Sequence, residues 1–146
     1  MGISIDSKNM ELDCGYGGFI KFRNFISCCM DSYYKCNGEL EEHYRELIQS
    51  SYLFNDKYIK EFFDKYDNET HIIQKKYKIP QYVLTFLYQA DTNGSLSVAG
   101  TKKLYDIIKN SKTDMTFGYS DSEWTFEEFV KLLADCIENN VGLKWS

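Results

Sequence analysis

The sequence has little of what marks a secreted, membrane-bound or disulfide-stabilised protein. Its start, MGISIDSKNM, lacks the basic flank and apolar run of a secretion signal, and no stretch approaches the ~20 apolar residues that span a bilayer. The five cysteines are an odd number and include an adjacent pair, which is typical of buried thiols in a reducing cell. We therefore expect a cytoplasmic protein that makes no contact with a membrane.

Positive charge is also scarce. Seventeen Lys and Arg residues stand against 22 Asp and Glu residues, which gives a formal net charge of −5. Broad binding to nucleic acid needs a positive field that displaces counterions from the phosphates. The charge balance therefore argues against general nucleic-acid binding.

Motifs for catalysis are absent as well. The sequence contains two histidines and no G-x-S-x-G, H-E-x-x-H or H-x-E with P-C-x-x-C pattern. A zinc site built from Cys29, Cys36 and His43 would lack a C-x-x-C pair and a fourth ligand. We therefore expect a protein that is not an enzyme and uses no metal or cofactor.

The residues that are present predict one α+β domain over residues 1–146, mainly helical, with an N-terminal β-hairpin. Hydrophobic residues make up 43% of the chain, so a single core is expected. Residues 2–14 alternate apolar and polar side chains around a Ser-Lys-Asn turn, as a hairpin does. Helical spacing or caps predict helices from Phe19 to Tyr33, Asn37 to Ser50 and Asn55 to Tyr66, after Pro80, around Leu104–Ile108, and from Thr125 to Ile137.

Three further stretches complete this prediction. The segment YDNETHIIQKKYKI stays open between helix and strand, and KTDMTFGYSDSE predicts a polar, mobile connection. The end of the chain, VGLKWS, predicts a short strand. Asn37 is expected to cap the second helix, and Thr125 with Glu128 forms a capping box for the last one.

The segment QADTNGSLSVAG, residues 89–100, predicts an EF-hand-like helix-loop-helix in the second half. In the twelve-residue EF-hand geometry Gly94 takes the sixth position, with positive φ, and Gly100 takes the twelfth, where calcium needs a bidentate Glu. Asp91 is then the single carboxylate of the loop. We therefore expect a tight turn that binds no metal, with Ser97 capping the helix that follows.

The segment CGYGGFIKFR, residues 14–23, joins the predicted hairpin to the first helix. It is neither the dinucleotide fingerprint nor a P-loop, because the third Gly and a Gly-Lys-Ser/Thr sequence are missing. Its glycines either permit a sharp strand-to-helix turn or expose backbone N–H groups to a phosphate, which nearby cations would neutralise. The candidate anion site consists of Gly15, Tyr16, Gly17, Gly18, Lys21 and Arg23.

The predicted second helix carries a cluster of carboxylates. Three of them lie in its first turn, where the helix dipole favours negative charge. The cluster is either a solvated helix face or the surface that binds a partner protein. The candidate partner-binding residues are Glu39, Glu41, Glu42 and Glu46.

The segments GYGGFIKFR and FLYQADTNGSLS resemble an uncharacterised family of small bacterial and phage proteins. That family has a G-Y-x-x-F-x-x-F-R stretch and a degenerate EF-hand-like D-x-x-G loop. Gln89, Asn93 and Ser95 stand here where the family has His, Asp and Glu. The resemblance implies no known activity, but it does imply a phage context in which small acidic domains often bind a host protein.

We therefore expect a non-enzymatic interaction protein, an anti-defence inhibitor of a host defence or regulatory protein. The alternative is a small-anion or nucleotide-binding domain that sequesters a signal molecule through the Gly15–Gly18 turn.

Overall fold

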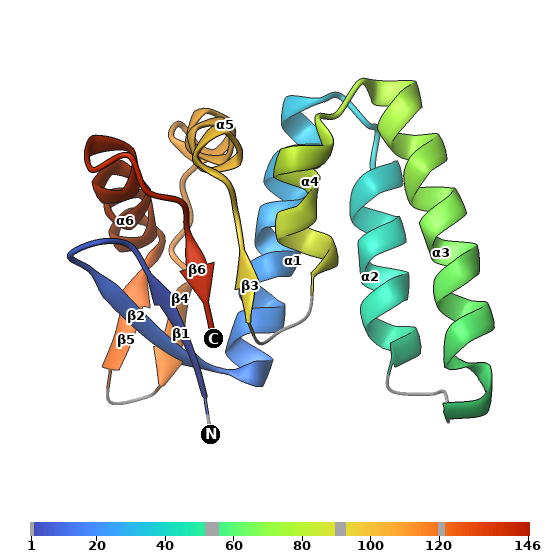
Figure 1. The fold of residues 1–146 in the computed structure, drawn as a ribbon, viewed down its shortest axis with the longest axis horizontal. Helices are drawn as coiled ribbons and strands as arrows, with labels where there is room; N and C mark the ends of the chain where they lie inside the picture. The colour runs from blue at the N-terminus through green and yellow to red at the C-terminus, as the bar shows by residue number, and fades with distance from the viewer. Residues whose placement is uncertain (1, 52–55, 90–92, 120–121) are drawn as a thin grey trace.

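The computed structural model describes residues 2–51, 56–89, 93–119 and 122–146. These residues form six helices and six strands, so the fold is α+β and mainly helical, as the sequence predicts (Figure 1). In chain order the elements are β1 (Gly2–Asp6), β2 (Glu11–Gly15), α1 (Tyr16–Tyr33), α2 (Glu39–Ser51), α3 (Asp56–Tyr77), α4 (Gln81–Tyr88), β3 (Gly94–Ser95), α5 (Val98–Ile108), β4 (Thr116–Tyr119), β5 (Ser122–Thr125), α6 (Phe126–Glu138) and β6 (Lys144–Trp145).

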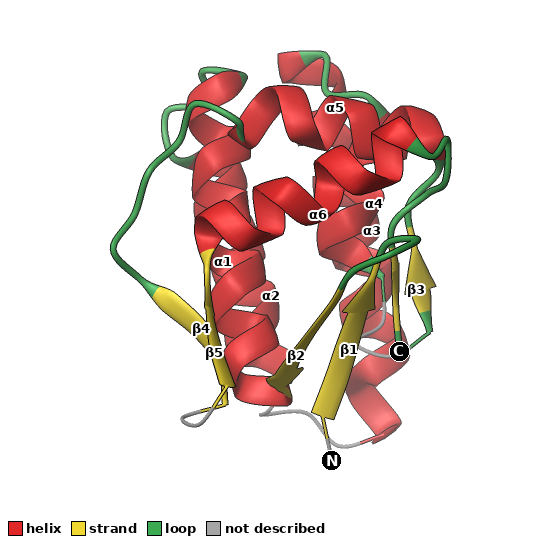
Figure 2. Ribbon diagram, turned by 90° about the vertical axis from the view of Figure 1, so that its left-hand side faces the viewer, coloured by secondary structure: helices red, strands yellow, loops and turns green. Residues whose placement is uncertain are grey.

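A four-stranded antiparallel sheet brings the two ends of the chain together. Its strand order is β2-β1-β6-β3, so β6 lies between the N-terminal hairpin and the short strand after α4. The predicted hairpin is confirmed, with Ile5 opposite Leu12, and so is the predicted C-terminal strand. The strands lie in the lower half of Figure 2, where both ends of the chain are also found.

A second hairpin, β4–β5, occupies the stretch in which the sequence predicts a polar connection. Phe117 and Trp124 face each other across this hairpin and both are buried. The indole N–H of Trp124 donates a hydrogen bond to the carbonyl of Asp13 at 3.0 Å, which ties the hairpin to β2. The prediction was wrong because the aromatic residues of these two four-residue strands, Phe117, Tyr119 and Trp124, are too few to indicate alternation.

Helix α1 carries the centre of the core. Phe22 is fully buried, and its ring makes edge-to-face contacts with Phe129 at 4.5 Å and Phe117 at 5.0 Å between centroids. Such aromatic pairs add about 0.5–1.5 kcal/mol each beyond the burial of their area. Tyr33, which the helical spacing places on the same face, is instead 44% exposed at the C-terminal end of the helix.

Helix α3 is longer than the sequence predicts. It is one helix from Asp56 to Tyr77, so the segment that stayed open between helix and strand is helical. Asn55, its predicted first residue, lies outside the described part of the chain. The helix ends before Lys78, which has a positive φ of 55°, and Pro80 is the N-cap of α4. None of the helices that the structure describes is both long and apolar enough to cross a lipid bilayer.

The N-terminus of α2 is capped from another helix. The buried carboxylate of Asp31 in α1 accepts hydrogen bonds from the backbone N–H groups of Gly38 at 2.9 Å, Leu40 at 3.0 Å and Glu41 at 3.2 Å. Asn37, the predicted cap, lies in the turn before the helix with a φ of 54°. That prediction was wrong because the cap comes from Asp31, seven residues before the first N–H that it binds.

The two other predicted caps are confirmed. The Ser97 hydroxyl accepts from the backbone N–H of Gly100 at 3.0 Å at the start of α5. The Thr125 hydroxyl accepts from the N–H of Glu128 at 3.3 Å at the start of α6.

Candidate functional site

The loop after α4 is built into the sheet. The side-chain amide of Gln89 donates to the carbonyl of Ser95 at 2.6 Å and accepts from its N–H at 3.0 Å. The Gln89 side chain therefore extends the hydrogen bonding of the sheet at β3, the last strand in the sheet order. Gln89 stands at the first position of the predicted EF-hand-like loop, and its amide is already engaged in these two hydrogen bonds. Asp91, the single carboxylate of the predicted loop, lies outside the described residues.

Gly94 does not have the positive φ that the EF-hand geometry predicts. The positive φ belongs to Asn93, at 57°, while Gly94 lies in β3 and pairs with Trp145. A Cβ on Gly94 would meet the indole ring of Trp145 at 2.0 Å. The structure therefore requires glycine here for a close approach and not for a turn.

The structure does not assemble the predicted anion site as a whole. Gly15 is the N-cap of α1 and the other glycines lie in its first turn, but the two cations point elsewhere. The Lys21 ammonium donates a hydrogen bond to the carbonyl of Thr116 at 3.4 Å. Arg23 is 3% exposed, and its guanidinium lies 4.7 Å from the ring centroid of Phe19. This buried cation is not available to a ligand that approaches from solvent.

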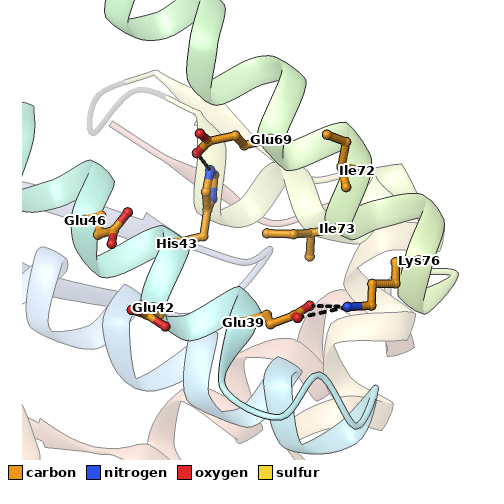
Figure 3. A pocket seen from close by; sticks show the side chains of 8 residues that line it. All are labelled: Glu39, Glu42, His43, Glu46, Glu69, Ile72, Ile73 and Lys76. Atoms are coloured by element: carbon orange, nitrogen blue, oxygen red, sulfur yellow. Dashed lines mark hydrogen bonds and ion pairs between the residues drawn. The ribbon is translucent and has the colours of Figure 1, made fainter.

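The acidic residues of α2 fall into two groups. Glu41 pairs with Arg45 one helical turn away, at 3.0 Å. The other three line a groove of about 340 Å³ between α2 and α3. We call this the α2–α3 groove (Figure 3); it is lined by Glu39, Glu42, His43, Glu46, Glu69, Ile72, Ile73 and Lys76.

One end of the groove is closed by an internal ion pair. The Lys76 ammonium lies 2.9 Å and 3.1 Å from the two carboxylate oxygens of Glu39, and the Tyr77 hydroxyl donates to the same carboxylate. The hydrogen bond from Tyr77, followed by that from Lys76, lowers the pKa of Glu39, and the carboxylate in turn raises the pKa of Lys76. The Lys76 ammonium is therefore already paired with the Glu39 carboxylate.

The rest of the groove combines negative charge with an exposed aliphatic surface. Glu42 and Glu46 are exposed, and neither forms an ion pair within the described residues. Beside them Ile72 is 65% exposed and Ile73 is half-buried. With four carboxylates and one ammonium in its lining, the groove has a net charge of −3 when its histidine is neutral.

His43 lies at the base of the groove and points from α2 toward α3, as Figure 3 shows. Its Nε2 is 3.5 Å from a carboxylate oxygen of Glu69, and its Nδ1 is 2.9 Å from the hydroxyl of Tyr88. Because a carboxylate only accepts, a neutral ring with its proton on Nε2 directs that proton toward Glu69, and its Nδ1 accepts a hydrogen bond from the Tyr88 hydroxyl. Burial lowers the pKa of His43, and this exceeds the opposite effects of Glu69 and Glu46.

No protein-family model matches this chain, and searches of curated proteins and of solved structures find no significant match. The resemblance to the phage family therefore stays a prediction.

The structure also places the residues of the candidate zinc site. Cys29, Cys36 and His43 are all buried, and the cysteines are free. Burial raises the pKa of the Cys36 thiol to about 12 and also raises that of Cys29, so both remain protonated near neutral pH. Within the described ranges of the chain, no group of three His, Cys, Asp or Glu side chains has the arrangement of a metal site.

The sequence prediction found one wall of the groove and missed the other. It selected Glu39, Glu42 and Glu46 from the acidic face of α2 but nothing from α3. The signal for the second wall was the Ile72–Ile73 pair among polar neighbours. In a segment read as ambiguous between helix and strand, that pair could not be assigned to a face.

Proposed function

We propose that this protein is a non-enzymatic interaction protein whose α2–α3 groove binds a basic, amphipathic segment of a partner protein. The observation that carries the proposal is the position of Ile72, an aliphatic side chain 65% exposed, beside the carboxylates of Glu42 and Glu46. Exposed aliphatic surface next to charge of one sign is typical of grooves that receive an amphipathic helix.

Charge complementarity selects the kind of partner. The groove has a net charge of −3 within a chain of net charge −5, and its single ammonium, on Lys76, is bound to Glu39. Lysine or arginine side chains of a partner would therefore find Glu42 and Glu46 available, while its apolar side would cover Ile72 and Ile73. Such a field also accelerates the approach of a cationic partner.

The resemblance to phage proteins narrows the proposal further. It favours a host defence or regulatory protein as the partner, in the cytoplasm, and an inhibitory outcome in which the groove occupies a basic recognition segment of that protein. This narrower form rests on the resemblance alone.

A pair of synthetic peptides tests the proposal. One is an amphipathic helix with leucines on one face and lysines on the other, and the second has glutamate in place of every lysine. We expect the lysine peptide to bind, with an affinity that falls as salt is added, and the glutamate peptide to show no binding. Fluorescence anisotropy of labelled peptides measures both.

Matched charge variants locate the binding site. Glu42→Gln with Glu46→Gln should weaken binding of the lysine peptide by roughly 2- to 30-fold, because each exposed ion pair is worth about 0.2–1 kcal/mol. The control pair, Glu11→Gln with Glu123→Gln, removes the same charge from β2 and β5 at the other end of the molecule (Figure 1). Equal losses from the two pairs would show that only overall charge matters and would refute the groove as the site.

The alternative function, anion or nucleotide binding at the Gly15–Gly18 turn, has weaker support because Arg23 is buried against Phe19 and Lys21 is bonded to Thr116. A thermal-shift screen with nucleotides is its test. At about 100-fold excess over the dissociation constant, a true ligand would contribute roughly 2.7 kcal/mol.

A further inference from the structure

We propose that protons compete with the basic partner for the α2–α3 groove and that His43 is the group that takes up the proton. This inference rests on the proposed function, because it describes how occupation of the same groove depends on pH. The supporting observation is the position of the His43 imidazole of α2 between Glu69 of α3 and Tyr88 of α4.

The imidazole of His43 connects the groove to the protein interior. His43 is 6% exposed and lies on α2, with Glu69 of α3 at 3.5 Å from one ring nitrogen and Tyr88 of α4 at 2.9 Å from the other. The ring also lies 5.9 Å from that of Tyr88, centroid to centroid. Nδ1 is within hydrogen-bond distance of the Tyr88 hydroxyl, and Nε2 faces the Glu69 carboxylate, which would form an ion pair with a charged ring.

Among the residues that line the groove, the charged groups around His43 are mainly carboxylates. Glu42 and Glu46 come from its own helix and Glu69 from α3, and all three line the groove with it. Lys76 of α3 is the one cation in that lining, and it is bound to Glu39. Tyr88, on α4, stays neutral because burial raises its pKa. A proton on His43 would therefore add positive charge at the site where a partner's ammonium is expected.

The proton on His43 and the partner's ammonium groups share one negative field, that of the carboxylates in the groove. With neutral His43, the net charge of the lining is −3. With His43 protonated, the imidazolium pairs with Glu69 and the net charge becomes −2. The lowered pKa of His43 means that the neutral, binding-competent form dominates near neutral pH, and acidification below it weakens partner binding.

Nuclear magnetic resonance of the two histidines tests this directly. His43 and His71 are the only histidines in the sequence, and the variant His71→Gln assigns their signals. The titration midpoint of His43 is measured in the free protein and in protein saturated with the lysine peptide. If protonation weakens binding about threefold, as one exposed ion pair would allow, reciprocity requires the midpoint to fall by about half a pH unit in the complex.

Variants separate His43 from the other titrating groups. His43→Gln should bind the lysine peptide at about pH 7.5, and its affinity should no longer fall threefold when the pH is lowered through the histidine titration. In His71→Gln the threefold loss of affinity should remain. Should His43→Gln fail to fold, the midpoints in the wild-type protein decide alone.

The possible failures are distinguishable. Binding of the lysine peptide with an unchanged His43 midpoint would overturn this inference and leave the proposed function standing. No binding at about pH 7.5 would refute the proposed function, and this inference with it.

Discussion

Gly94 and Trp145 face each other across the β3–β6 pair, and the indole of Trp145 occupies the space that any side chain on Gly94 would need. A Cβ at Gly94 would lie 2.0 Å from Cε2 of the indole. Trp145 is 1% exposed and packs against Phe19 and Phe86, with ring centroids 6.0 Å and 5.4 Å apart. Trp145 therefore determines which residue is allowed at position 94.

Gly94→Ala should destabilise the protein by about 1–3 kcal/mol, because the ring cannot move without disturbing the core. Urea unfolding measures the loss, which should be the same with and without calcium. Gly17→Ala is the matched control: a Cβ there meets nothing within 4 Å, and the site is helical, so the expected effect ranges from none to a gain of about 1 kcal/mol. A tolerated alanine at position 94 would contradict the close-approach explanation.

Asp31→Ala should cost about 1–3 kcal/mol, because it removes the acceptor for three backbone N–H groups at the start of α2. Asn37→Gly is the control, since the predicted cap has a φ of 54° that glycine adopts freely, and it should leave the stability nearly unchanged. Chemical unfolding of both variants compares them. A larger loss for Asn37→Gly than for Asp31→Ala would restore Asn37 as the cap.

Asp135 should make a pH-dependent contribution to stability. Its carboxylate accepts from the Ser7 hydroxyl at 2.6 Å and from the backbone N–H of Asn9 at 2.8 Å, and these bonds lower its pKa below the ordinary value of 3.8. A depressed pKa in the folded state gives stability that is complete above the unfolded value and is lost as the pH falls through the folded one.

The variant Asp135→Asn should therefore be less stable than the wild type at about pH 7, and the difference should shrink as the pH falls below ~4. Thermal unfolding across this range measures the difference. Glu138→Gln, which removes an exposed carboxylate from the same helix, should show no such convergence. A constant difference between Asp135→Asn and wild type at every pH would mean that packing, and not charge, explains its effect.

The elements that the sequence predicted correctly are those whose causes are local. The hairpin of β1 and β2 follows from alternation over a few residues, and the caps at Ser97 and Thr125 follow from a hydroxyl three residues before the N–H that it binds. The β4–β5 hairpin escaped prediction because its stability comes from contacts such as Trp124 with Asp13, which lie far apart in sequence.

The acidic face of α2 shows the same division within the candidate site. The sequence determined that Glu39, Glu41, Glu42 and Glu46 share one helix, because helical spacing is a local property. The pair of Glu41 with Arg45, four residues on, follows from the same spacing. Only the tertiary structure decided that the other three border a groove.

The second wall of the groove and the histidine at its base depend on packing between helices. Glu69 and Tyr88 reach His43 from α3 and α4, 26 and 45 residues further along the chain. The sequence by itself determined an acidic, aromatic-rich α+β protein and most of its helices. The docking of α3 against α2 decided where an exposed isoleucine, a set of carboxylates and a buried imidazole meet. Contacts between distant segments fix that position, and local patterns do not encode it.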